Sequence, residues 1–376
     1  MDFSPSEAEV EVSRLAAQVL GGTGRDGTAA DASAAGTDLD CSLWKELAQS
    51  GLLSLAMPGD LGGDGLGVQA TAALLTEVGR RAARVPALAT LALGVLPVAR
   101  SANAGLKRQL LAGVASGETI LTAAIREPSA PMPQAPATVT TLTGMHLTGI
   151  LLAGSTATVS GVKVGVPYAA AARWILIPAS TTGGEAVVVV VEPDADGLSC
   201  QLTRSSSGMP EYTLRLDDSP IAAVLDGCTA ADLYELAVAG ACAVADGVLA
   251  AALDLTTEHV RSREQFGRPL ATFQAVAQQI ADVYATARTL HLAAVSACWQ
   301  LDAGLDAGRD VDVAAYWLAE HGPAALRICH HLHGGLGMDV TYPLPRYSAL
   351  MTDLAAFVGG AADRLDRLGA REAAGR

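Results

Sequence analysis

The sequence predicts an α+β protein built from three parts: an N-terminal helical domain over residues 1–118, a middle antiparallel β-domain over 119–227 and a C-terminal four-helix bundle over 228–376. The composition changes at both boundaries. Ala- and Leu-rich segments with helical spacing flank a stretch rich in Thr, Gly, Ser and Val, in which no Asp, Glu, Lys or Arg occurs from Pro128 through Val162. Helices, then strands, then long helices are typical of an α+β chain.

The first domain contains a predicted helix with an apolar stripe of Leu43, Trp44, Leu47 and Leu52. Gly51 lies where such a helix would end. The glycine-rich segment Pro58–Gly67 follows no strand and precedes no Lys-Ser/Thr pair, which favours a turn over a nucleotide-binding loop.

Short β-branched runs mark the strands of the middle domain. Trp174–Pro178 and Ala186–Val191 read as buried strands bounded by turn residues. A half-exposed strand is predicted where Tyr212, Leu214 and Leu216 alternate with polar residues. The acidic segment Glu192–Gly197 suggests calcium, but an EF-hand loop starting at Asp194 would need a Glu where Ser205 stands, so a plain turn is favoured.

Three long amphipathic patterns predict the helices of the last domain. They run from Leu233 to Val260, from Phe273 to Leu301 and from Val311 to His331.

Composition and charge exclude several classes of protein. The chain has 39 acidic and 25 basic residues, a net charge of −14, which argues against a nucleic-acid partner. The apolar window Pro86–Ala99 is too short to span a membrane, and no basic segment precedes an apolar one as in a secretory signal. Six scattered cysteines without a CxxC motif predict reduced thiols in a cytoplasmic protein.

Two clusters of residues could carry chemistry. The first is residues 261–274, RSREQFGRPLATFQ, where three arginines occur within eight positions and a helix should break at Gly267–Pro269 and restart near Phe273. These arginines are either solvated side chains of a helix-turn-helix or phosphate ligands, because guanidinium binds phosphate bidentately.

The second cluster is residues 330–346, HHLHGGLGMDVTYPLPR, in which paired glycines would let a ligand approach the backbone. His330, His331 and His333 suggest a metal, but no fourth ligand stands at a suitable spacing, so no metal site is predicted. The sequence contains neither a GxSxG nor a Walker A motif.

These residues resemble the acyl-CoA dehydrogenase family. Arg263–Gly267, Pro269-Leu270 and Phe273-Gln274 are similar to its RxQFGxxLxxFQ signature, and His333–Gly337 with Tyr342-Pro343 to its GGxGxxxxYP segment. The resemblance extends over most of the chain, including Gly62-Gly63 in the first domain and Glu127-Pro128 at the family's EP turn.

The resemblance implies an FAD enzyme that oxidises acyl-CoA thioesters: a Glu removes the α-proton and the β-hydrogen leaves as hydride to the flavin. It also implies that FAD is shared across a subunit interface and that electrons pass to an electron-transfer flavoprotein or a similar acceptor. The residues that would contact FAD, by position in the family's motifs, are Arg263, Phe266, Gln274, His331, Gly334, Gly335 and Gly337.

The sequence departs from the family at the catalytic base. The two positions at which members carry the Glu are occupied by Val358 and Ala237, and neither side chain can accept a proton. Glu235, Asp353 and Asp363 are the nearby acids, but each is offset from those positions. No catalytic residue is therefore assigned.

The sequence departs from the family at the flavin ring as well. Arg126 replaces a Thr or Ser that bonds the flavin, and Ser129–Met132 replaces Gly-x-Gly-Ser after the EP turn. Gly165-Val166-Pro167, after Lys163, replaces an aromatic-hydroxyl motif. The resemblance therefore predicts a chain without its own flavin seat.

The chain most resembles the non-catalytic subunit of α2β2 acyl-CoA dehydrogenases that act on steroid side-chain CoA esters. In that interpretation a homologous partner supplies the Glu and the flavin seat. The alternatives are a self-sufficient homotetramer with a relocated base, Glu235 or Asp353, and a non-enzymatic scaffold.

Overall fold

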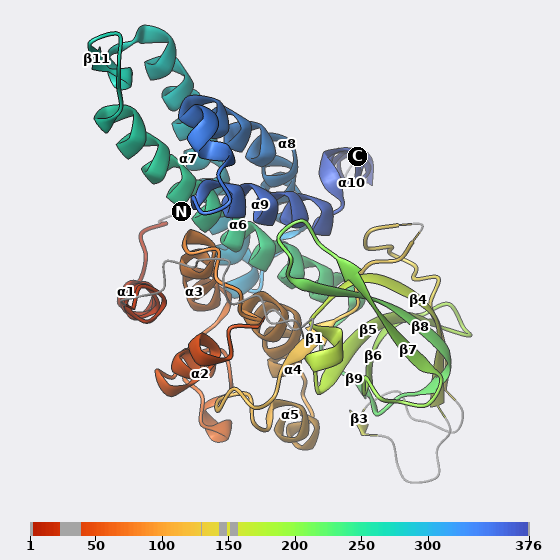
Figure 1. Cartoon of the computed structure of the whole chain (residues 1–376). Helices are drawn as coiled ribbons and strands as arrows, with labels where there is room; N and C mark the ends of the chain where they lie inside the picture. Colours follow the sequence, from red (N-terminus) through yellow and green to blue (C-terminus); the bar gives the residue numbers. More distant parts are fainter. Residues whose placement is uncertain (1–2, 23–38, 129, 143–148, 151–156, 375–376) are drawn as a thin grey trace. The chain divides into compact units, whose positions relative to one another are not determined.

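The structure is a computed structural model that describes residues 3–22, 39–128, 130–142, 149–150 and 157–374. It divides into two compact units. A helical unit comprises Met1–Ala35, Ala72–Ala83 and Val238–Arg376, and a β-rich unit comprises Gly36–Thr71 and Arg84–Ala237. The predicted order of helices, strands and helices is confirmed (Figure 1). The domain boundaries at residues 118 and 227 remain predictions.

The helices of the β-rich unit are short. They are α2 (Cys41–Gln49), α4 (Leu96–Ala99) and α5 (Ala104–Leu111). Asp40 caps α2 by accepting a hydrogen bond from the backbone N–H of Leu43 at 2.8 Å, and Gly51 follows its end with φ 80°, as predicted. Within the apolar segment Pro86–Ala99, residues Leu88–Val95 form a π-helix that is almost entirely buried.

One nine-stranded sheet forms the body of this unit, with the order β3-β9-β6-β5-β2-β4-β8-β7 and β1 beside β5. The strands are β1 (Leu121–Ala123), β2 (Val139–Leu142), β3 (Gly149–Ile150), β4 (Ala157–Pro167), β5 (Trp174–Thr181), β6 (Ala186–Val191), β7 (Leu198–Arg204), β8 (Pro210–Pro220) and β9 (Ala223–Leu225). The two predicted buried strands are β5 and β6, and the predicted half-exposed strand is β8. Most pairings are antiparallel, but β1 and β2 each pair parallel with β5.

The helical unit contains α1 (Glu7–Leu20), the end of α3 (Val68–Arg80) and most of α6 (Ala230–Ser262). It continues with α7 (Gln274–Asp302), α8 (Gly308–His333), α9 (Leu344–Phe357) and α10 (Gly360–Ala374). The helices α7 and α8 pack side by side (Figure 1).

Two glycines bring α3 and α6 into backbone contact. A Cβ at Gly79 would lie 2.0 Å from the carbonyl oxygen of Val244, and one at Gly247 would lie 1.8 Å from that of Thr76. The hydroxyl of Thr76 donates to the carbonyl of Ala243 at 3.2 Å. The absence of side chains at both glycines is therefore what permits this crossing.

The helix α6 is apolar enough and long enough to cross a membrane by composition alone, yet 83% of its most apolar 18-residue window is buried in the protein. The helix α6 is thus a longer apolar segment than Pro86–Ala99, and it is buried as the core helix of a folded domain is. The six cysteines are free thiols.

Candidate functional site

The link between α6 and α7 is a minimal β-hairpin. The helix α6 ends at Ser262, before the predicted break at Gly267–Pro269, and the strands β10 (Glu264–Gln265) and β11 (Arg268–Pro269) then pair antiparallel. Phe266 and Gly267 form the turn, with φ values of 56° and 78°. Positive φ at both central residues is the geometry of a type I′ turn, which a phenylalanine adopts at some cost.

This hairpin lies at the far end of α6 and α7 (Figure 1). The side chains of residues 264–268 are exposed. The side chain of Phe266 is 91% exposed and packs edge-on against Phe273, with the ring centroids 6.0 Å apart. Arg268 stacks on the other ring, with its Cζ 4.1 Å from the Phe273 centroid. An exposed aromatic held in a strained turn is expected to contact another molecule.

Two groups beside the hairpin suit an anionic ligand. The side chain of Arg263 is exposed and makes no hydrogen bond or ion pair within the described residues. Gln274 is exposed and is the first residue of α7, whose N-terminus has no side-chain cap among those residues. Uncapped backbone N–H groups at a helix N-terminus bind phosphate, as does a free guanidinium.

The three glycines after α8 are required for different reasons. Gly334 ends the helix with φ 58° and ψ −135°, a conformation that disfavours a side chain. A Cβ at Gly337 would lie 3.0 Å from the Cβ of His333, so internal packing explains that glycine. A Cβ at Gly335 would meet nothing within 4 Å, which leaves its backbone open to a ligand.

A pair of stacked histidines joins the hairpin to this glycine turn. The rings of His259, on α6, and His333, on α8, lie 4.4 Å apart with an angle of 19° between their planes. Tyr342 packs against His333 at 5.3 Å. Sequence reasoning missed His259, whose only signal is its position one helical turn before Arg263.

The three histidines of the second cluster do not form a metal site. His331 is exposed, His330 Nε2 lies 2.5 Å from the hydroxyl of Ser348, and His333 Nδ1 donates to the carbonyl of Cys329 at 2.8 Å. Within the described part of the chain, no group of three or more His, Cys, Asp or Glu side chains is placed so that it could hold a metal ion. The predicted FAD contacts Arg263, Phe266 and Gln274 thus group at the hairpin, and His331, Gly334, Gly335 and Gly337 at the end of α8.

The two positions at which the resemblance places a catalytic Glu are both buried. Ala237 and Val358 each have 0% exposure. The carbonyl of Val358 accepts a hydrogen bond from Arg364 Nε at 2.5 Å, and Arg364 is itself paired with Asp312 at 2.9 Å. Sequence reasoning missed this buried ion pair, which fixes the backbone at Val358.

The nearby acids are already engaged. Asp363 pairs with Arg367 at 2.8 Å. Glu235 and Asp353 are half-buried, and each interacts with neighbouring groups. The structure therefore identifies no free carboxylate among these three.

The β-rich unit contains a buried ion pair beside the expected flavin seat. Lys163 Nζ lies 2.7 Å from Glu127 Oε1, and their side chains are 0% and 2% exposed. Glu127 Oε1 also accepts bonds from the backbone and the hydroxyl of Thr138, at 3.0 and 2.7 Å, and Oε2 accepts one from Ala137 N at 2.8 Å. This pair therefore ties Glu127, and through it Ala137 and Thr138, to Lys163 on β4.

The two residue changes at the expected flavin seat contact each other. A Cβ at Gly165 would lie 2.7 Å from Arg126 Nη1. Arg126 Nε is buried without a hydrogen-bond partner within the described residues, and burial lowers the pKa of this guanidinium, with Glu211 opposing the shift. A cation packed over a glycine does not offer the hydroxyl donors expected for a flavin ring. Ser129, the first residue of the segment that replaces Gly-x-Gly-Ser, lies outside the described residues.

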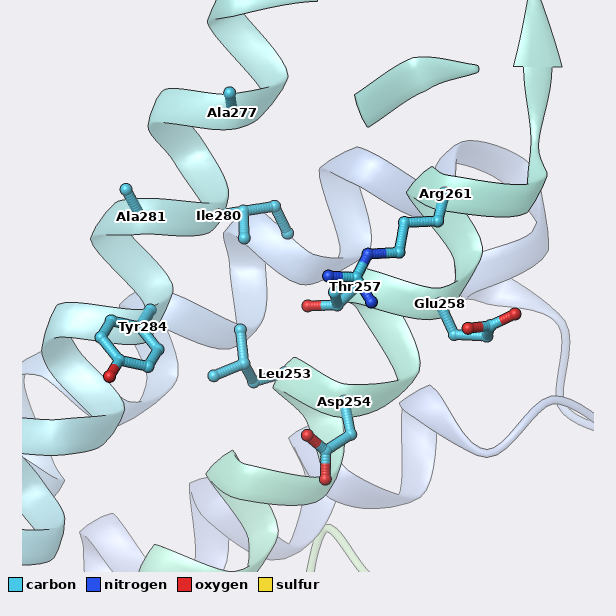
Figure 2. A pocket seen from close by; sticks show the side chains of 9 residues that line it. All are labelled: Leu253, Asp254, Thr257, Glu258, Arg261, Ala277, Ile280, Ala281 and Tyr284. Carbon is cyan, nitrogen blue, oxygen red and sulfur yellow. The ribbon is translucent and has the colours of Figure 1, made fainter. Parts of the chain in front are cut away.

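A groove of about 620 Å³ lies between α6 and α7. Leu253, Thr257 and Ile280 point into it, and the carboxylates of Asp254 and Glu258 lie at its edge (Figure 2). Asp254 is paired with Arg80 at 2.7 Å. The groove is thus lined by apolar side chains together with the charged side chains of Asp254, Glu258 and Arg261, and the guanidinium of Arg261 reaches into it (Figure 2).

Comparison with known proteins gives a consistent set of relatives. Two family models match: the acyl-CoA dehydrogenase N-terminal domain over residues 25–118 and the C-terminal domain over residues 236–372. Acyl-CoA dehydrogenase FadE28 of Mycobacterium tuberculosis is 45% identical over 99% of both chains, and FadE27 of the same organism is 32% identical over 98% of both.

Two solved structures are similar over nearly the whole chain. A variant of the Tcur3481–Tcur3483 steroid ACAD is 34% identical with a TM-score of 0.86, and the match covers 98% of each chain. The ChsE4–ChsE5 complex from Mycobacterium tuberculosis is 29% identical with a TM-score of 0.87, and the match covers 99% of each.

Proposed function

We infer that this chain, which belongs to the acyl-CoA dehydrogenase family and has its fold, is the subunit of a heteromeric enzyme that completes the FAD site of a catalytic partner. The family places it among flavin-dependent oxidoreductases that act on acyl-CoA. We further propose that the chain contributes no catalytic base of its own.

The observation that carries this proposal is the environment of Val358. A catalytic base must reach the substrate proton within hydrogen-bond distance. At this position the side chain is apolar and fully buried, and the backbone is held by the buried Arg364–Asp312 pair. Ala237 is likewise apolar and fully buried, so neither position used by the family supplies a carboxylate.

The residues expected around FAD fall into two regions, one that suits the cofactor and one that does not. The hairpin and the glycine turn fit the pyrophosphate and adenosine of FAD, because Arg263 is unpaired within the described residues and the backbone of Gly335 is open. Bound FAD would supply the two-electron oxidation. The region of Arg126 and Gly165 does not fit the flavin ring, so we propose that the ring rests on the partner subunit and that FAD is shared across the interface.

The partner and substrate follow by analogy with the similar structures. Both are named as pairs of different proteins, and one is named as a steroid ACAD. We propose that this chain forms an α2β2 heterotetramer with a homologous catalytic subunit and acts on steroid side-chain CoA esters. An electron-transfer flavoprotein or a similar acceptor would reoxidise the flavin, and we expect the complex in the cytoplasm.

The test compares the chain alone with the chain co-expressed with a homologue that carries the Glu. FAD released on unfolding and dehydrogenation of a steroid side-chain CoA ester are measured in both samples. The lone chain should hold little FAD and show no turnover, whereas the complex should do both. Full FAD loading and turnover by the lone chain would overturn the proposal.

Three variants and one control variant separate the alternatives. Changing Glu235→Gln or Asp353→Asn should leave turnover of the complex unchanged, and a loss would instead indicate a relocated base. Arg263→Ala should weaken FAD retention by the complex, whereas Arg309→Ala, at an exposed arginine near the start of α8, should not. Equal FAD retention by both arginine variants would favour a scaffold that does not hold FAD.

A further inference from the structure

We propose that His259 and His333 form a positioning pair that fixes the Arg263 hairpin relative to the Gly334–Gly335 turn, and that the pair holds only while both rings are uncharged. The proposal rests on the proposed function only in that these two segments are the expected FAD ligands. The pair itself can be tested in the absence of flavin.

The first argument is geometric. His259 precedes Arg263 by one helical turn, and the backbone N–H of Arg263 donates to the carbonyl of His259 at 2.8 Å. His333 is the last residue of α8 and adjoins Gly334. Because the two rings are stacked at 4.4 Å, they connect the last turn of α6 directly to the end of α8.

The second argument is the protonation of His333. Its Nδ1 donates to the carbonyl of Cys329, so the neutral ring carries a lone pair on Nε2. That atom is buried and has no hydrogen-bond partner within the described residues. A proton on Nε2 would therefore create a buried donor without an acceptor, which is unfavourable.

The third argument is the charge around the pair. The titratable and charged groups that face the two rings are Arg263 on α6, His330 on α8 and Tyr342 after α8. Burial lowers the pKa of both histidines; Arg263 adds to this at His259, and His259 and His330 add to it at His333, against the bond to Cys329. No carboxylate is paired with either ring in the described part of the chain. Protonation would thus place two imidazolium ions face to face beside a guanidinium.

The consequence concerns the backbone of the hairpin. At neutral pH the stacked rings restrain the end of α6, and the hydrogen bonds of Arg263 N and Leu270 N are protected. A proton on His333 leaves a buried donor without an acceptor, and a second proton on His259 adds repulsion between the rings, so the hairpin opens more often as the rings become charged. FAD affinity is not a suitable readout for this step, because the added positive charge would itself attract pyrophosphate.

The test measures hydrogen exchange of the amides of residues 262–270 in the full-length chain at pH 7.5 and pH 5, corrected for the intrinsic rate. The wild-type protection should fall roughly tenfold on acidification, the scale expected for losing one aromatic contact. The double variant His259→Phe with His333→Phe retains a stack that cannot titrate, so its protection should not change with pH. His333→Ala should show low protection at both values.

The matched control is His321→Phe, because His321 also lies on α8 and stacks on an aromatic ring, that of Trp317 at 4.1 Å. It should behave like the wild type. A wild-type protection independent of pH would overturn the proposal, even if the double variant does not fold. So would a double variant that loses protection at pH 5 as the wild type does.

Discussion

Replacing Lys163 with methionine should destabilise the β-rich unit more than any surface substitution. The change keeps an unbranched side chain that is shorter by one atom and removes its charge. Glu127 would then be a buried carboxylate with three hydrogen bonds, from the backbone and hydroxyl of Thr138 and from Ala137 N, but without a cation. The carbonyl of Pro178, which accepts a bond from Lys163 Nζ at 2.8 Å, would lose that donor.

The expected loss is about 3–5 kcal/mol, the usual cost of removing one partner of a buried ion pair. Glu127→Gln should cost a similar amount, because it leaves Lys163 buried and unpaired. The double variant should be more stable than the sum of the two losses predicts, by at least about 2 kcal/mol, because it removes both buried charges.

Urea unfolding at pH 7, followed by tryptophan fluorescence, measures the free energy of unfolding of each variant. A cost below about 1 kcal/mol for Lys163→Met would refute this reasoning, as would additive losses in the double variant.

The pH dependence gives an independent check. Burial alone raises the pKa of Glu127, but the bonds from Lys163 and Thr138 outweigh it and hold the pKa below its usual 4.5. The stabilisation by Glu127 is therefore complete above that pH and is lost as the pH falls through the folded-state pKa. The difference between the wild type and Glu127→Gln should shrink accordingly in acid.

Three further substitutions test other parts of the structure. Asp312→Asn removes the buried negative charge that pairs with both Arg364 and Arg371 and should cost about 3–5 kcal/mol, seen as a lower Tm; an unchanged Tm would contradict this. The hydrogen bond to Asp246 raises the pKa of His291, so this pair stabilises fully below pH 6.5 and its contribution is lost as the pH rises through the raised pKa. The Tm of His291→Phe should therefore approach that of the wild type between pH 6 and pH 9. Phe266→Ala should change stability by less than about 0.5 kcal/mol, because the ring is exposed, yet it should reduce FAD retention by the complex; retention at the wild-type level would contradict its assigned role.

The long helices could be predicted from the sequence because apolar periodicity determines them locally. The predicted segments Phe273–Leu301 and Val311–His331 correspond to α7 and α8 within three residues at each end. The strands β5 and β6 could be predicted for the same reason, since their β-branched runs are bounded by turn residues.

What could not be predicted depends on contacts between distant residues. The sequence of Leu88–Val95 is apolar throughout, as in an ordinary buried helix, and gives no sign that this segment forms the wider turns of a π-helix. The contact of His259 with His333 joins positions on two helices that periodicity treats separately. The hairpin at Phe266 was missed because a two-residue strand has no periodicity to detect.

The crossing of α3 and α6 limits which residues can replace Gly79 and Gly247 during evolution. A glycine within a helix ordinarily costs about 1 kcal/mol relative to alanine, so selection for stability alone would remove it. At Gly369 in α10, where an added Cβ meets nothing within 4 Å, that replacement is open to the chain. At Gly79 and Gly247 the same methyl group would collide with the neighbouring backbone. Homologues that keep this crossing should therefore vary at the position of Gly369 and retain glycine at the positions of Gly79 and Gly247.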